Sequence, residues 1–175
     1  MTQDKTDVKM GKSETNGRTV LFPGSFDPFT RGHADLVERA LRLFDHVVIG
    51  VGCNEQKQGW LPVQERIESL QSYYALDPRV SVASYACLTV DFARSCGATA
   101  ILRGVRSIKD YEYELSLADV NSRLVPQLET VVLYARPELA ACSSSVVREL
   151  AHFGHSIAAW LPEGLSYPSL SKKTD

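Results

Sequence analysis

The sequence predicts an α/β protein with a doubly wound, five-stranded parallel sheet in a single domain. Short β-branched runs alternate with segments of helical periodicity, a pattern typical of a parallel sheet. Two runs, residues 47–52 and 130–134, are almost continuous in Val, Ile and Leu, as expected for strands covered by helices on both sides. The chain has 175 residues, enough for one domain with a full core and too few for two ordinary domains.

The first strand is predicted at residues 19–22 and the first helix at 33–44. The remaining strands are predicted at 47–52, 80–83, 100–102 and 130–134, and helices follow them at 63–75, 89–96, 110–124 and 144–153. In the first helix, apolar residues recur at the spacing of a helix that packs one face on a sheet. Those residues are Leu36, Val37, Ala40, Leu41 and Phe44, and we expect Asp35, Glu38, Arg39 and Arg42 to face water.

The termini are expected to lie outside the folded domain. Residues 1–17 are polar, mixed in charge and without the apolar core of a secretion signal, which predicts a disordered N-terminal extension. We assign residues 18–165 to the domain and 166–175 to a C-terminal tail. No apolar run reaches the ~18 to 20 residues of a membrane span, so we expect no membrane contact and a cytoplasmic protein.

Composition and cysteine spacing narrow the function classes. The net charge is −2, with 44% hydrophobic and 23% charged residues, which is typical of a soluble globular protein and gives no basic excess for nucleic acid. Four cysteines form no CxxC pair, which favours reduced, mostly buried thiols over a structural metal site: Cys53, Cys87, Cys96 and Cys142.

The stretch from Pro23 to His33 reads as the end of a strand, a tight turn and the start of a helix. It contains two glycines and two prolines. Free N–H groups and the positive end of the helix macrodipole favour an anion at such a helix start, and the histidine adds a directed donor. The turn is therefore a candidate phosphate site. Its Thr30-x-Gly32-His33 segment resembles the T/HxGH motif of nucleotidyltransferases.

Four loops are expected to meet at one edge of the sheet, because open parallel sheets bind ligands beyond the carboxyl ends of their strands. These loops carry Ser25 and Phe26, then Lys57, then the segment from Arg103 to Arg106, and then residues 139–145. Cations, hydroxyls and a helix N-terminus together predict a pocket for several phosphates.

Two common phosphate-binding motifs are absent or incomplete in this sequence. The chain has no GxxxxGK[ST] segment, and Glu55 stands where the GxGxxG pattern that begins at Gly50 needs its third glycine. No Ser-His-Asp or Cys-His arrangement indicates a covalent nucleophile. Transfer between two bound phosphate compounds needs only positioning and charge stabilisation.

Further segments make the resemblance specific: ILRGVR at 101–106, DYEYE at 110–114, DVN at 119–121 and CSSSVVRE at 142–149. In order and spacing they resemble the bacterial phosphopantetheine adenylyltransferases over residues 18–162. The resemblance implies a Rossmann-like, magnesium-dependent, cytoplasmic homohexamer. Its reaction moves AMP from ATP to 4′-phosphopantetheine and gives dephospho-coenzyme A and pyrophosphate.

The resemblance also implies residue roles. His33 and Ser25 contact the α-phosphate of ATP, and His33 stabilises the transition state. Lys57 and Arg103 hold the acceptor phosphate, and Arg106 contacts the triphosphate. The implied catalytic residues are His33, Ser25, Lys57 and Arg106. The 4′-phosphopantetheine site comprises Ser25, Lys57, Thr89 and Arg103. The ATP site comprises Ser25, Phe26, His33, Gly104, Val105, Arg106, Glu114, Leu139, Ala140, Ala141, Cys142, Ser143, Ser144 and Ser145.

No protein carboxylate is expected to anchor Mg²⁺, which ATP oxygens and water can hold, and feedback binding of coenzyme A is a further expectation. Two alternative functions stay open at this point. The acceptor could be nicotinamide mononucleotide or another phosphorylated alcohol, and the chain could be a nucleotide sensor without catalysis. Locally, Ser143 to Ser145 could be an ordinary helix N-cap, and Glu114 could be an exposed acid.

Overall fold

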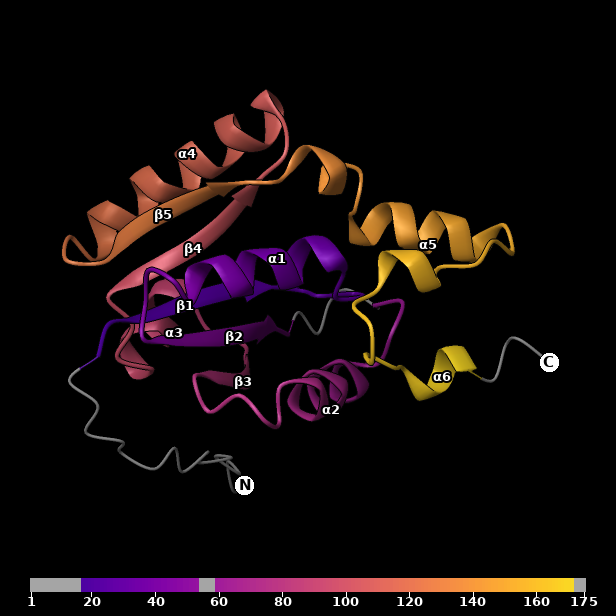
Figure 1. Ribbon diagram of the computed structural model, residues 1–175. Coiled ribbons are helices and arrows are strands. Elements are labelled where there is room, and N and C mark those ends of the chain that lie inside the picture. Colours follow the sequence, from indigo (N-terminus) through magenta and orange to yellow (C-terminus); the bar gives the residue numbers. More distant parts are fainter. Residues whose placement is uncertain (1–16, 54–58, 172–175) are drawn as a thin grey trace, which may run out of the picture.

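The computed structural model describes residues 17–53 and 59–171, and it has a parallel sheet covered on both faces by helices (Figure 1). The strands are β1 (Thr19–Gly24), β2 (His46–Gly52), β3 (Val80–Tyr85), β4 (Ala100–Val105) and β5 (Glu129–Tyr134). The α-helices are α1 (Arg31–Ala40), α2 (Val63–Tyr73), α3 (Thr89–Ser95), α4 (Ile108–Leu124), α5 (Ser144–His152) and α6 (Pro168–Ser171). Two 3₁₀ turns, η1 (Pro137–Leu139) and η2 (Ala158–Trp160), flank α5.

The strand order is β3-β2-β1-β4-β5, and all neighbouring strands are parallel. Val20 of β1 pairs with Val47 of β2 on one side and with Ala100 of β4 on the other. The order reverses between β1 and β4, since the chain builds β1, β2 and β3 outward and then returns to the far side of β1. This arrangement confirms the predicted doubly wound, five-stranded sheet, and it puts a ligand crevice at the carboxyl ends of β1 and β4.

Two separate cores lie on the two faces of the sheet. Val20 and Phe22 of β1 belong to the core that packs under α1 and α2, whereas Leu21 points to the core under α3. This alternation is the period of two that a β-strand imposes. Helix α4 packs on β4 and β5, and its residue Leu117 lines a small cavity together with Thr89 of α3 and Ile101 of β4, so α4 lies on the same face of the sheet as α3.

Several boundaries differ from the sequence prediction, and one difference moves site residues. Strand β4 continues to Val105 through ladder pairs with β5, so Arg103 and Gly104 lie in the strand and not in the loop after it. Helix α1 begins at Arg31 with Thr30 as its N-cap, which makes His33 the third helical residue. The helix ends at Ala40, four residues before the predicted end.

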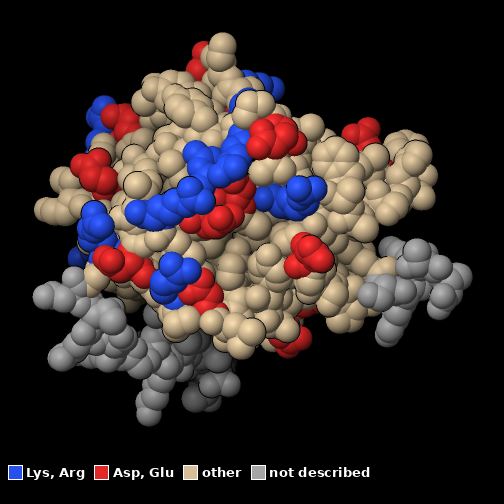
Figure 2. Space-filling view, viewed as in Figure 1, with Lys and Arg blue, Asp and Glu red and all other residues tan. Residues whose placement is uncertain are grey.

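The prediction that Asp35 faces water is wrong. Its side chain is only 10% exposed and forms ion pairs with Arg39 at 3.0 Å and Arg136 at 2.8 Å. The pair with Arg136 ties α1 to the segment after β5. Acidic and basic side chains are intermingled over this face of the molecule (Figure 2).

The folded core continues past residue 165, where the sequence analysis placed the domain boundary. Tyr167 is 2% exposed and belongs to the core under α1 and α2, and Leu170 packs against the same core. The N–H of Ser169 donates to Glu65 of α2 at 2.8 Å. The segment interpreted as a tail therefore includes residues that complete the α1–α2 side of the protein.

Strand β5 is less covered than its apolar sequence predicts. Its end residues are exposed and its four central residues are only partly buried. β5 is an edge strand with a neighbouring strand on one side only, so its apolar side chains have fewer residues to pack against. None of the helices in the described part of the chain is both long and apolar enough to cross a bilayer.

Candidate active site

A cavity of about 420 Å³ lies at the carboxyl ends of β1 and β4, where the strand order reverses. The turn after β1, the first turn of α1, the end of β4, helix α4 and the start of α5 contribute its walls. It brings together most of the residues that the sequence analysis assigned to ATP and to the acceptor phosphate. Those residues are Ser25, Phe26, His33, Arg103, Gly104, Arg106, Glu114, Leu139, Cys142, Ser143, Ser144 and Ser145.

His33 is fixed by the start of its own helix. Its Nδ1 accepts the backbone N–H of Thr30 at 3.0 Å, and the Thr30 hydroxyl lies 3.1 Å from the same atom. The two residues form a reciprocal capping box. Because Nδ1 is the acceptor of a backbone N–H, the neutral imidazole carries its proton on Nε2. The ring therefore offers an N–H donor to the cavity.

Three phenylalanine rings surround this imidazole. The centroids of Phe22, Phe26 and Phe29 lie 6.1, 5.3 and 5.4 Å from that of His33. Burial and, as the smaller cause, the nearby positive charge of Arg106 together lower the pKa of His33 to about 4. At neutral pH His33 is uncharged and available as a hydrogen-bond donor.

This lowered pKa predicts a specific pH dependence. Between about pH 6.5 and 4 the unfolded chain binds a proton at this position while the folded chain does not, so folding stability falls as the pH drops through that window. We also expect turnover to be level near neutrality and to fall only as the pH approaches about 4. Thermal unfolding and turnover measured from pH 4 to 8, compared with His33→Gln, check both. An activity loss centred near pH 6.5 in a folded protein contradicts this assignment.

Close packing joins the start of α1 to the segment before α5. A Cβ on Gly32 would lie 2.9 Å from the carbonyl oxygen of Cys142, so only glycine permits this approach. The Thr30 hydroxyl donates to the same carbonyl at 3.4 Å. The residues that cap the helix bearing His33 thus also hold the segment predicted to bind the nucleotide.

Arg103 and Glu114 form a bidentate ion pair across the cavity wall. The Nε–Oε2 distance is 2.5 Å and the Nη2–Oε1 distance is 2.6 Å, and Arg103 Nη1 donates to the Pro23 carbonyl at 3.1 Å. Glu114 is 7% exposed, which excludes the alternative that it is an exposed acid. The pair fixes the plane of the guanidinium while leaving a quarter of the arginine side chain exposed.

A second, smaller cavity of about 80 Å³ lies behind this ion pair on the α3–α4 face. It shares Pro23, Arg103 and Glu114 with the larger cavity and includes Thr89, the first residue of α3. The structure therefore brings Thr89 and Arg103 together, as the predicted acceptor site requires. Arg103 stands between the two cavities.

Arg106 lies at the rim, immediately after β4. Its Nε donates to Asp110 at 3.0 Å, and its backbone N–H donates to the same carboxylate at 3.2 Å. The arginine side chain remains 41% exposed. Arg106 is thus oriented over the cavity by α4 but open to solvent on one side.

Some predicted residues do not line the cavity. The Val105 side chain is buried in the protein, and its carbonyl accepts the N–H of Ala135. Ala140 and Ala141 lie in the turn after η1 without lining the larger cavity. Lys57 falls outside the described residues. Gly104 does line the cavity, and a Cβ there would overlap the Leu36 side chain of α1.

The serines before α5 are helix caps as well as cavity residues. Ser143 is the N-cap and accepts the N–H of Val146 at 3.3 Å, which confirms the local alternative stated from the sequence. Ser144 donates to the Pro28 carbonyl at 2.8 Å, and Ser145 accepts from Arg148 at 3.2 Å. Arg148 also lines the cavity. It lies in the segment 142–149, but nothing in the periodicity of α5 singled it out.

Comparison with known proteins identifies the family. The model of the cytidylyltransferase-like family matches residues 21–150. A phosphopantetheine adenylyltransferase from Phocaeicola vulgatus is 49% identical over 148 residues, covering 85% of this chain and 97% of the relative. A protein of the same name from Porphyromonas gingivalis is 51% identical over 145 residues, covering 83% and 94%. The chain belongs to the phosphopantetheine adenylyltransferase family.

The wider structural comparison agrees on the fold. A bifunctional NMN adenylyltransferase/ADP ribose pyrophosphatase from Francisella tularensis superposes with a TM-score of 0.65 at 16% identity, covering 89% of this chain and 49% of that one. The family membership confirms that the chain is a nucleotidyltransferase with a Rossmann-like domain.

Proposed function

We propose that this protein transfers AMP from ATP to 4′-phosphopantetheine, giving dephospho-coenzyme A and pyrophosphate. The proposal rests on family membership and on one geometric observation. A neutral His33 with Nε2–H as its donor shares a cavity with Arg103 and Arg106 at the switch point of the sheet. This cavity therefore contains the hydrogen-bond donor and the cations that the attack of one phosphate on another requires.

The chemistry follows from charge. A phosphate oxygen of the acceptor attacks the α-phosphorus of ATP, the bond to the β-phosphate oxygen breaks, and pyrophosphate leaves. Both reactants are anions, so Arg103 and Arg106 offset their repulsion. The extra negative charge on the α-phosphate in the transition state is stabilised by Nε2–H of His33 and by the turn that carries Ser25. No protein group needs to become covalently linked to the nucleotide.

We propose that magnesium enters with the nucleotide as MgATP. Among residues 17–53 and 59–171 no cluster of three or more His, Cys, Asp or Glu side chains is arranged to hold a metal ion. The nearest carboxylates are engaged, Glu114 with Arg103 and Asp110 with Arg106. Because both carboxylates are paired with arginines, their engagement supports magnesium that is held by the nucleotide. Phosphate oxygens and water are suitable ligands for this ion.

Pyrophosphate release from MgATP tests the function directly, with 4′-phosphopantetheine, nicotinamide mononucleotide or no acceptor present. We expect release that depends on 4′-phosphopantetheine. Release only with nicotinamide mononucleotide would support adenylyl transfer but contradict 4′-phosphopantetheine as the acceptor. ATP binding without release under any condition would favour the nucleotide sensor.

We propose that copies of the chain assemble, as the hexamer implied by the family resemblance, in the cytoplasm. Six of the eleven exposed large hydrophobic side chains in the described residues lie on α4: Ile108, Tyr111, Tyr113, Leu115, Val120 and Leu124. Such a concentration marks an interaction surface. Light scattering should give a mass about six times that of the chain, and Leu115→Glu should lower it. A monomer with full activity would overturn the assembly.

We further propose feedback binding of coenzyme A, since it combines the pantetheine arm and the adenine that the two substrates bring separately. The two cavities that meet at Arg103 support this, because one extended ligand could occupy both. Coenzyme A should then compete with ATP in equilibrium binding. Independent, simultaneous binding of both would count against it.

A further inference from the structure

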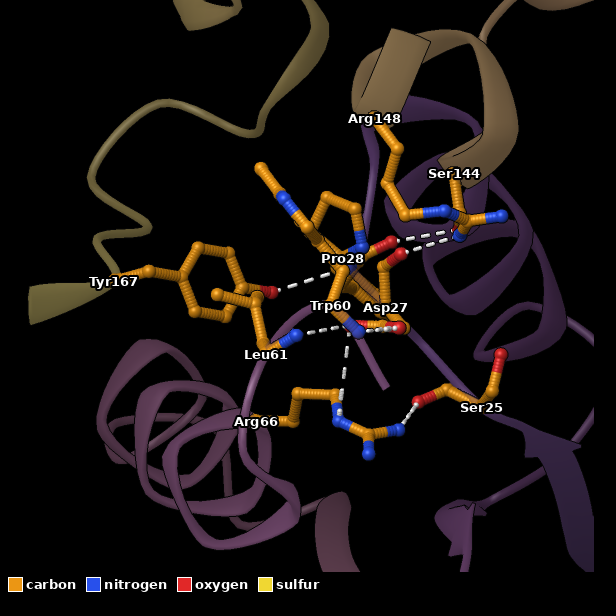
Figure 3. Close-up of polar contacts among 10 residues, drawn as sticks. Ser25, Asp27, Pro28, Trp60, Leu61, Arg66, Ser144, Arg148 and Tyr167 are labelled. Carbon is orange, nitrogen blue, oxygen red and sulfur yellow. Dashed lines mark hydrogen bonds and ion pairs between the residues drawn. The ribbon is translucent and has the colours of Figure 1, made fainter. Parts of the chain in front are cut away.

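The turn between β1 and α1 is held by side chains from distant parts of the chain (Figure 3). The N–H of Phe29 donates to the Tyr167 hydroxyl at 3.0 Å. The backbone carbonyl oxygens of three residues in the turn also accept hydrogen bonds from side chains elsewhere in the chain. Ser25 O accepts from Arg66 at 2.6 Å, Asp27 O from Arg148 at 2.6 Å, and Pro28 O from Ser144 at 2.8 Å.

The turn needs such support because its conformation is not the one that its sequence prefers. Phe26 has φ of 47°, in the left-handed region that a bulky residue rarely adopts. Backbone in this region is strained for a bulky side chain and persists only where the surroundings hold it. Phe26 lies next to Ser25 and packs its ring against His33.

The Asp27 carboxylate makes the most direct link between this turn and the rest of the protein. Its Oδ2 accepts the N–H of Trp60 at 2.7 Å, and its Oδ1 accepts the N–H of Leu61 at 2.8 Å. The two amides lie just before α2, on the connection from β2. One side chain, 10% exposed, thus joins the turn after β1 to the start of α2.

Arg66 of α2 completes this link. It is 4% exposed, and its Nε lies 4.0 Å from Asp27 Oδ1 while its Nη1 donates to Ser25 O. Nε is buried and has no hydrogen-bond partner within the described part of the chain. The negative charge of Asp27 is therefore what compensates the buried guanidinium, and an uncharged replacement would not do so.

We propose that Asp27 is a positioning residue for the adenylyl transfer. Its carboxylate, anchored on two amides and on Arg66, holds the turn so that Ser25 and His33 keep their places around the α-phosphate. This inference rests on the proposed function for the roles of Ser25 and His33. In a reaction that depends on alignment, a displacement of about 1 Å lowers the rate by about 10²-fold.

Asp27→Asn tests the proposal in the full chain. An amide oxygen can accept one of the two N–H groups, but the NH₂ group then faces the other N–H as a second donor. We expect faster hydrogen exchange at the amides of Trp60 and Leu61, a kcat lowered by about 10- to 10²-fold, and an ATP dissociation constant within about twofold of wild type. A purely structural role would lower the unfolding temperature without lowering kcat in the folded protein.

Asp45→Asn is the matched control, because Asp45 also accepts a backbone N–H, that of Arg18 at 2.7 Å, near the opposite ends of β1 and β2. It should leave kcat unchanged. If Asp27→Asn fails to fold, Asp27→Asn/Arg66→Gln removes the uncompensated charge and should fold with the same loss of kcat.

Each outcome decides a separate point. A folded Asp27 variant with kcat within twofold of wild type, or with unchanged exchange at both amides, overturns the positioning role. Wild-type protein without phosphopantetheine-dependent pyrophosphate release overturns the proposed function instead. In that case the exchange of the two amides still decides whether Asp27 anchors the turn.

Discussion

Replacing His33 with alanine is expected to lower kcat by about 10²- to 10³-fold while leaving the ATP dissociation constant nearly unchanged. His33 donates from Nε2 because Thr30 occupies Nδ1, and its lowered pKa keeps the ring neutral. A neutral donor adds little to binding of the ground-state phosphate. It contributes most when negative charge builds up on the α-phosphate, so the effect belongs in kcat.

Equilibrium ATP binding and steady-state kinetics on the same preparation check this result. His46→Ala is the matched control, because His46 lies at the start of β2 and contacts Ser81 at 2.9 Å, away from the cavity. That variant should turn over at the wild-type rate. A His33→Ala variant whose kcat falls less than about fivefold would show that another group stabilises the transition state.

The order and kind of the secondary structure could be predicted because each element carries its own periodicity. The β-branched runs and the apolar stripe of α1 reflect local packing on one sheet, and all five strands were found. Strand ends were less accurate, because hydrophobicity does not determine where a ladder stops. Arg103 and Gly104 continue β4 since they pair with Val132 and Leu133 of β5.

The candidate site could be predicted where a short motif carries the chemistry. The turn and His33 lie together in the chain, and parallel strands bring Arg103 and Arg106 to the same edge. Partnerships between distant polar residues left no such signal. Asp35 read as a solvent-facing residue because its partner Arg136 lies far along the chain, and the same distance hid the contact of Tyr167 with Phe29.

The buried pair of Arg103 and Glu114 predicts the second large effect, on stability. Arg103→Ala leaves Glu114, with a side chain 9% exposed, without its counter-charge. Removing one partner of a buried pair typically costs about 3–5 kcal/mol, so we expect a loss of that size in the free energy of unfolding by urea. Arg123→Ala, on the helix α4 that also carries Glu114, is the control. Its pair with Asp119 is exposed, and the loss should stay below about 1 kcal/mol.

The double variant Arg103→Leu/Glu114→Leu separates stability from substrate binding. Without either charge the site needs no compensation, and apolar replacements of a buried pair are often neutral or stabilising. Stability should therefore return toward wild type. The KM for 4′-phosphopantetheine should nevertheless stay raised by about tenfold or more, because a charge-assisted contact to the acceptor phosphate is still missing. A double variant with wild-type stability and wild-type KM would contradict the role of Arg103, since the protein would then bind its acceptor without the guanidinium that stands between the two cavities.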